Sequence, residues 1–154
     1  MGLFDSLRRR NPNPPERPIT KDSVLISLSE SERTDFGRVD FAAQPPDQQV
    51  FSAIWALESG VNCDGFASYV ASEDESIPFA PRALETVGAR RAASIVRRAL
   101  ELPPESSNEL SDEQLEELEE LDQAFMAYPD DLTGLLYDFV AARPQSFGEV
   151  PALS

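Results

Sequence analysis

Apolar side chains recur every three to four residues along most of the chain, which is the period of a helix with one buried face. No segment alternates apolar and polar residues between hairpin turns, so strands are not expected. Helices are predicted after Thr20, after Asp47 and after Gly65, between Ser76 and Gly88, from Ala89 to Pro103, from Ser111 to Pro129, and from Asp130 or Asp131 to Pro144. The pattern therefore predicts an all-α fold: one compact domain of five to seven helices.

The segment after Asp47 differs from the others because it is apolar almost all round. Such a helix is buried on most sides, so it is predicted to be the central helix, with Trp55 and its neighbours in the core. Residues 1–19 contain closely spaced prolines and are expected to form a flexible arm. The predicted organisation is an arm over 1–19, a helical domain over 20–147 and a tail over 148–154.

One long stretch of the chain carries charges of a single sign, all negative. Between Arg98 and Arg143 there are thirteen acidic residues and no Lys, Arg or His. At 100° per residue, the helix after Ser111 places Leu115, Leu118, Leu121, Phe125 and Tyr128 on one side and carboxylates on the other. Unmatched carboxylates repel one another, so a charged partner is a natural explanation for them. The candidate partner-binding residues are Glu113, Glu116, Glu117, Glu119, Glu120, Asp130 and Asp131.

Composition narrows the function classes. A formal net charge of -15 makes direct binding to nucleic acid or an anionic membrane unfavourable and favours a basic protein partner. Histidine is absent, which removes the usual triads, general bases and imidazole metal ligands, so we expect no enzyme, no metal and no cofactor. Cys63 is expected to be a small buried or half-buried thiol. The sequence has no secretory or membrane-spanning run, and we expect a cytoplasmic protein.

Four arginines form the main basic feature of the predicted domain. Arg90 with Arg97, and Arg91 with Arg98, are seven residues apart and lie opposite the apolar face of their helix. In one interpretation they are solvated or pair with carboxylates of the same molecule. In the other they form a self-association surface that meets the acidic face of a second copy, as in a possible homodimer. The sequence does not choose between the two.

Three segments carry a resemblance to a known family: ALESGVNCDGFASYV, ALETVGARRAASIVRRALEL and LEELDQAFMAYPDDLTGLLYDFVAAR. In order and spacing they resemble the bacterial DNA-mimic proteins of the nineteen-kilodalton type, over roughly Pro46 to Phe147. The matching positions are a turn motif of Val61, Asn62, Gly65, Phe66 and Tyr69, a junction of Leu84, Gly88 and Ala89, and a signature of Leu121, Asp122 and Phe125. Three positions depart from the family pattern: Gly60, Cys63 and Asp64.

The resemblance implies an all-α, dimeric protein whose acidic surface imitates the phosphates of duplex DNA and occupies the DNA site of a transcription factor. The residues themselves leave two further hypotheses open. One is an immunity or inhibitor protein that neutralises a basic toxin or nuclease. The other is a hydrolase that relies on carboxylates or a metal, although no spacing in the sequence indicates such a site.

Overall fold

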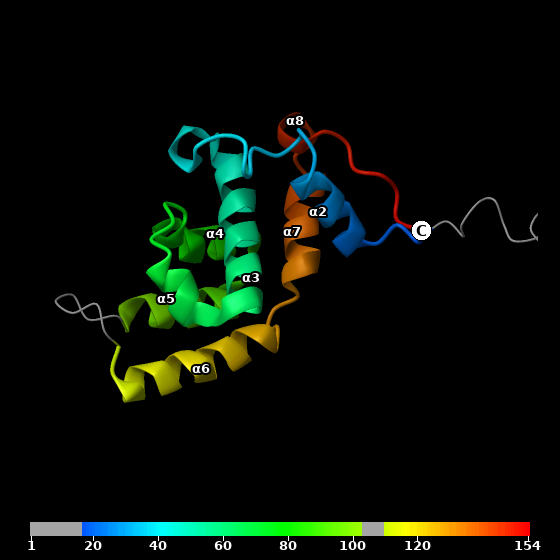
Figure 1. The fold of residues 1–154 in the computed structure, drawn as a ribbon. Coiled ribbons are helices and arrows are strands. Elements are labelled where there is room, and N and C mark those ends of the chain that lie inside the picture. Colours follow the sequence, from blue (N-terminus) through cyan, green and yellow to red (C-terminus); the bar gives the residue numbers. More distant parts are fainter. Residues whose placement is uncertain (1–16, 103–109) are drawn as a thin grey trace, which may run out of the picture.

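The computed structural model describes residues 17–102 and 110–154 (Figure 1). Its elements in chain order are α2 (Lys21–Ser29), η1 (Phe41–Ala43), α3 (Pro46–Ala71), η2 (Ile77–Phe79), α4 (Ala80–Val87), α5 (Arg90–Glu101), α6 (Asp112–Met126), α7 (Leu132–Ala141) and α8 (Pro144–Phe147). The described ranges contain seven α-helices and no strand, which confirms the predicted all-α fold. The predicted arm lies almost entirely outside them.

Helix α3 is the centre of the molecule, as predicted. It packs against α4, α5 and α6, while α2 pairs with α7 on its other side (Figure 1). The side chains of Phe51, Ile54 and Leu57 are fully buried. Trp55 is only partly buried and stacks on Phe51 with 5.4 Å between ring centroids. The prediction that Trp55 lies at the middle of the core is therefore wrong, because α3 keeps one narrow side toward solvent.

Local signals account for most helix ends. Thr20 and Ser23 form a reciprocal capping box at the start of α2, and Ser111 and Gln114 form another at the start of α6. Gly88 ends α4 in the left-handed conformation with φ +93°. These three boundaries confirm the sequence predictions.

Two helix starts differ from the predictions. Helix α3 begins at Pro46, with Pro45 as its N-cap, so Asp47 lies inside the first turn. Proline suits the first helical position because its fixed φ is already helical and its missing N–H is not needed there. Ser76 precedes the short 3₁₀ turn η2, and α4 itself starts only at Ala80.

The ends of the described chain meet beside α2. The Ile19 N–H donates to Ser154 Oγ at 2.7 Å, and the Ser154 N–H donates to the Ile19 carbonyl at 3.0 Å. Within the described residues, no helix has both the length and the apolar composition needed to cross a membrane.

Candidate partner-binding site

Helix α6 lies along one edge of the molecule and crosses the ends of α3 and α5 (Figure 1). Leu118 and Phe125 are 1% exposed and carry this packing. Leu115 and Tyr128, predicted to face inward with them, are instead 43% and 44% exposed. Leu115 lies about 60° from Leu118 around the helix and misses the narrow contact. Tyr128 lies two residues beyond the end of α6 and has φ +49°, so helical projection does not apply to it.

The opposite side of α6 carries exposed carboxylates. At 100° per residue they cover about 120° of arc facing away from the core. We call them the acidic face: Asp112, Glu113, Glu116, Glu119 and Glu120. None of them forms an ion pair with another residue of the described ranges.

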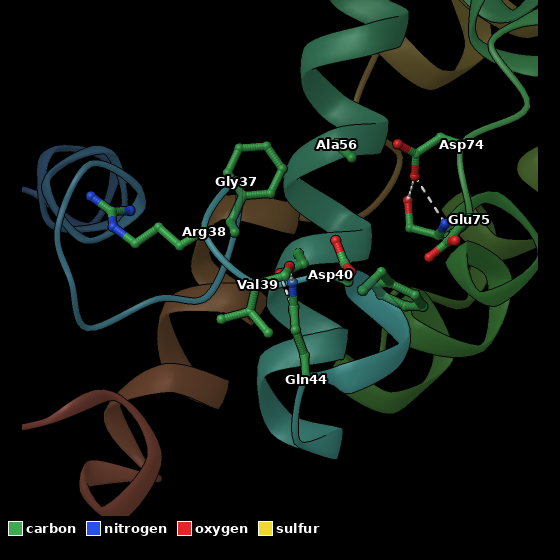
Figure 2. Close-up of a pocket in the computed structure, with 12 residues that line it drawn as sticks. Gly37, Arg38, Val39, Asp40, Gln44, Ala56, Asp74 and Glu75 are labelled. Carbon is green, nitrogen blue, oxygen red and sulfur yellow. Dashed lines mark hydrogen bonds between the residues drawn. The ribbon is translucent and has the colours of Figure 1, made fainter.

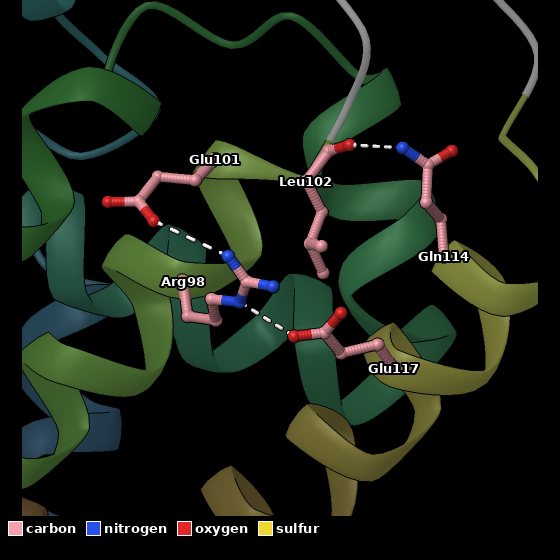
Figure 3. Close-up of polar contacts among 5 residues, drawn as sticks. All are labelled: Arg98, Glu101, Leu102, Gln114 and Glu117. Atoms are coloured by element: carbon pink, nitrogen blue, oxygen red, sulfur yellow. Dashed lines mark hydrogen bonds and ion pairs between the residues drawn. The ribbon is translucent and has the colours of Figure 1, made fainter.

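Glu117, at the border of the acidic face, is held within the molecule. Its carboxylate accepts a hydrogen bond from Arg98 Nε at 2.6 Å, and Arg98 Nη1 lies 3.7 Å from Glu101 (Figure 3). The Glu117 hydrogen bond and charge raise the pKa of Arg98 above its usual value. Beside this pair, Gln114 Nε2 donates to the Leu102 carbonyl at 2.7 Å. Together these contacts hold α6 against α5, so Glu117 stabilises the packing of the two helices.

Asp130 and Asp131, two other predicted binding residues, cap helices. Asp131 accepts from the Gly134 N–H at 3.1 Å and is the N-cap of α7. Asp130 reaches back along the chain and accepts from the Ala92 N–H of α5 at 2.9 Å. A helix N-terminus carries partial positive charge that offsets such carboxylates. Their negative charge is therefore partly neutralised by the helices they cap, whereas on the acidic face only Asp112 and Glu113, in the first turn of α6, lie near a positive helix end.

The four arginines of α5 differ in their contacts. Arg97 pairs with Glu85 at 2.5 Å, and Arg98 pairs with Glu117, as the intramolecular interpretation expects. Arg90 and Arg91 are exposed at the start of α5, where Arg91 makes one long contact of 3.5 Å to the Pro129 carbonyl. The structure thus pairs two of the four arginines, Arg97 and Arg98, with acidic side chains.

The turn motif is a kink inside α3. Val61, Phe66 and Tyr69 are buried, and Asn62 donates to the Tyr128 hydroxyl at 3.1 Å. The helix continues through Asn62, and only Gly65 departs from helical geometry, with φ +82° and ψ 173°.

Cys63 is exposed, so the prediction of a buried or half-buried thiol is wrong. Leu57 and Val61, before the kink, point into the core, and Cys63 lies about 200° around the helix from Val61, on the solvent side of α3.

Asp122 connects two distant segments that carry the predicted family resemblance. Its Oδ1 accepts from the Phe66 N–H at 2.7 Å, directly after the kink. A Cβ placed on Gly65 would lie 2.7 Å from Asp122 Oδ2, so the carboxylate would have to move, and the positive φ of +82° itself favours glycine. The sequence offered one signal for this contact: Gly65 has no side chain with which to cap the helix that follows it.

Among the acidic side chains that the structure describes, Glu58 has a raised pKa. It lies on α3 beside Asp22 and Tyr128. Burial raises the pKa of its carboxyl, the Tyr128 hydroxyl partly counteracts this, and the charge of Asp22 adds to the rise. No group of three or more Cys, Asp or Glu in the described ranges is arranged to hold a metal ion.

Together these features define a small all-α protein with an acidic face on an edge helix and internal carboxylate caps. The family model described as DMP19-like protein matches residues 42–143, about two thirds of the chain. The chain belongs to the DMP19-like protein family. No curated protein and no solved structure matches it.

Proposed function

We propose that this chain is a non-enzymatic binding module whose acidic face occupies the basic DNA-binding surface of a transcription factor or another nucleic-acid-binding protein. The carrying observation is that the five carboxylates of the acidic face are exposed and unpaired within the described residues. Membership of the DMP19-like family supports the same role, because the resemblance implies DNA mimicry.

The spacing of these charges suits a DNA-binding groove. With a rise of 1.5 Å per residue, Glu113, Glu116 and Glu120 are separated by about 4.5 and 6 Å along the axis of α6. Each strand of duplex DNA carries one charge per roughly 3.4 Å of axis, so the two spacings are of similar size. A basic groove that contacts successive phosphates can therefore meet successive carboxylates.

Helix α6 is also held rigidly enough to present the charges in a fixed pattern. Contacts from Gln114, Glu117 and Asp122 fix it to α5 and α3 along its length. A binding surface that is already ordered loses less conformational entropy when the complex forms. The ion pair of Glu117 with Arg98 thus helps to hold α6, and with it the unpaired carboxylates, in a fixed position. Glu117 itself is not expected to contact a partner.

Charge reversal of the acidic face tests the proposal. A variant with Glu113, Glu116, Glu119 and Glu120 all changed to Lys is used as bait in the native cell extract at low salt, beside the unmodified protein. The unmodified protein is expected to capture a DNA-binding protein and release it as salt rises, because exposed charges are screened within about 10 Å at 0.1 M. The variant is expected to capture none, with its helical content by circular dichroism retained.

A matched control carries the same charge change elsewhere, at the exposed residues Glu30, Glu32, Asp40 and Glu75. This control is expected to keep the captured protein. The purified partner should also bind duplex DNA, and the chain should displace that DNA in a competition assay. Equal capture by the α6 variant, or a partner bound together with its DNA, would refute the proposal. Recovery of a toxin or nuclease that binds no DNA would favour inhibition instead.

A further inference from the structure

A pocket of about 300 Å³ lies between α2, α3 and α7 (Figure 1). The residues that line it include Asp22 of α2, Trp55 and Glu58 of α3, and Tyr128 of the turn after α6. Ligand sites measure roughly 300 to 1,000 Å³, so this pocket suits a single side chain or a small molecule. Tyr128 places it at the C-terminal end of α6, the helix that carries the acidic face.

Trp55 contributes an aromatic ring to the pocket. Its indole is stacked on the Phe51 ring, with 5.4 Å between the centroids and 8° between the planes. The cation–π contacts within the described ranges involve the rings of Tyr137, Phe79 and Phe139, and none involves Trp55. Tryptophan attracts a cation more strongly than tyrosine or phenylalanine does. The indole is therefore available to a cation from outside the described chain.

Tyr128 supplies a second ring, and its backbone has an unusual conformation. Its φ of +49° is left-handed, and Glu73 is the one other non-glycine residue of the described ranges with a positive φ. The Tyr128 hydroxyl accepts a hydrogen bond from Asn62 Nδ2 at 3.1 Å and donates one to the Glu58 carboxylate. Strained residues persist where surrounding contacts hold them, and they concentrate at ligand sites. These hydrogen bonds fix the Tyr128 ring at the pocket.

The pocket contains negative charge without a cation. Glu58 is half-buried and Asp22 is exposed, and neither forms an ion pair with a described residue. None of the described residues that line the pocket is a lysine or an arginine. Burial raises the pKa of Glu58, so its ionised carboxylate is less stable there than in water. A cation placed beside Glu58 would offset this loss.

We infer that this pocket binds the guanidinium group of an arginine side chain from a basic protein partner. A planar guanidinium stacks on aromatic faces and donates two parallel hydrogen bonds to one carboxylate, so it matches Trp55, Tyr128 and Glu58. A lysine ammonium is compact and strongly hydrated, and it has no flat surface to stack. The inference rests on the proposed function, because the basic surface that meets the acidic face is taken as the source of the arginine.

A larger pocket, of about 490 Å³, lacks this combination of groups (Figure 2). Its aromatic residues are Phe36 and Phe41, and it contains neither tryptophan nor tyrosine. Its Asp74 already accepts hydrogen bonds from the backbone N–H and the hydroxyl of Ser76. Glu75, which is exposed, also lines this pocket. Glu75→Gln therefore removes one carboxylate charge from a pocket that is not expected to bind arginine, and it is the matched control for Glu58→Gln.

The test is a titration of the full chain with arginine capped as the N-acetyl methylamide. Trp55 is the one tryptophan of the sequence, so its indole N–H signal in an NMR spectrum reports on this pocket alone. A saturable shift in the millimolar range is expected. Glu58→Gln should weaken binding about tenfold, as expected for a lost hydrogen bond between charged groups, and Glu75→Gln should not. Glutamine keeps an acceptor for the Tyr128 hydroxyl, so a thermal melt of Glu58→Gln should show a folded protein.

Two further capped amino acids test the chemistry of the site. Capped citrulline has nearly the shape of arginine but no charge, and it should leave the Trp55 signal unchanged. Capped lysine should bind more weakly than capped arginine. An equal response to citrulline, a stronger response to lysine, or equal arginine affinities of Glu58→Gln and Glu75→Gln would each overturn the inference.

Capture of the partner from cell extract separates this inference from the proposed function. Glu58→Gln is expected to capture less of the DNA-binding protein than Glu75→Gln. Equal capture by these two variants would overturn the inference and leave the proposed function intact. Full capture by the charge-reversal variant of α6, together with reduced capture by Glu58→Gln, would refute the proposed function and support the arginine pocket.

Discussion

Two groups of acidic residues in one stretch of sequence behave in opposite ways. Asp122, Asp130 and Asp131 each accept a backbone N–H at the start of a helix. The acidic face on α6 points to solvent and forms no ion pair with any residue that the structure describes. The caps are all Asp, whereas the acidic face is mostly Glu. A short side chain holds its carboxylate near the backbone, and a longer one carries it outward.

The capping carboxylates stabilise the fold, whereas the carboxylates of the acidic face are free to contact a partner. The positive end of a helix partly neutralises each capping carboxylate. On the acidic face only Asp112 and Glu113, in the first turn of α6, have such compensation, so the field of Glu116, Glu119 and Glu120 extends into solvent until salt screens it. The formal net charge counts both groups of carboxylates alike, so it does not show which of them a partner could contact. The positions that carry the family resemblance include Asp122 and Gly65, which contact each other inside the fold, so the resemblance identifies the fold more directly than the binding surface.

The largest effect on stability is expected at the kink. Gly65→Ala should lower the free energy of unfolding by about 3 kcal/mol, because the φ of +82° with ψ of 173° suits only glycine and the new Cβ meets Asp122. Urea denaturation measures the loss. Gly37→Ala is the matched control: its φ is +72° but no atom lies within 4 Å, so about 1 kcal/mol is expected. Equal losses at both positions would show that neither the ψ of 173° nor the contact with Asp122 adds to the cost of a positive φ.

Removal of the cap at the kink should have the next largest effect. Asp122→Ala leaves the Phe66 N–H without its acceptor and should cost about 2 kcal/mol in unfolding free energy. In Gly65→Ala the new Cβ already displaces the carboxylate, so the double variant should lose less than the sum of the single variants. Strict additivity in the denaturation series would mean that the two residues do not act as one unit.

Asp130, which lies between α6 and α7 and caps α5, should contribute less to stability. Asp130→Ala is expected to cost about 1 kcal/mol, because the N-cap residue Ala89 has no side-chain acceptor and Asp130 supplies one from elsewhere. Amide hydrogen exchange should show faster opening in the first turn of α5. Protection lost uniformly over the molecule, with none specific to α5, would contradict a local capping role.

Local contacts are the part of the fold that the sequence predicts well. The capping boxes of Thr20 with Ser23 and of Ser111 with Gln114 each join residues three apart, so a pattern in the sequence contains both partners. The exposure of Glu113, Glu116, Glu119 and Glu120 likewise follows from helical periodicity alone.

Contacts between distant residues were not predictable in this way. Asp122 and Phe66 are 56 residues apart, and Asp130 and Ala92 are 38 apart. The missing side chain of Gly65 indicates that the following helix needs a cap, but no local pattern shows which distant residue supplies it. The pairing of Glu117 with Arg98 depends on how closely α5 and α6 pack, which periodicity does not set. The unsatisfied hydroxyl of Tyr69 is hidden for the same reason, since a buried aromatic looks identical whether or not its polar atom has a partner.

The smallest effect is expected on the acidic face itself, with opposite signs at neighbouring positions. Glu116 and Glu120 are four residues apart on α6, where like charges repel, so Glu116→Gln should raise the unfolding free energy by about 0.3 kcal/mol. Glu117→Gln removes the ion pair with Arg98 and should lower it. In 1 M salt, where the screening length is about 3 Å, the gain from Glu116→Gln should disappear, whereas the loss from Glu117→Gln should only shrink because Arg98 Nε lies 2.6 Å from the carboxylate. Thermal melts at low and high salt measure them, and a destabilising Glu116→Gln would mean that this carboxylate has a partner inside the fold.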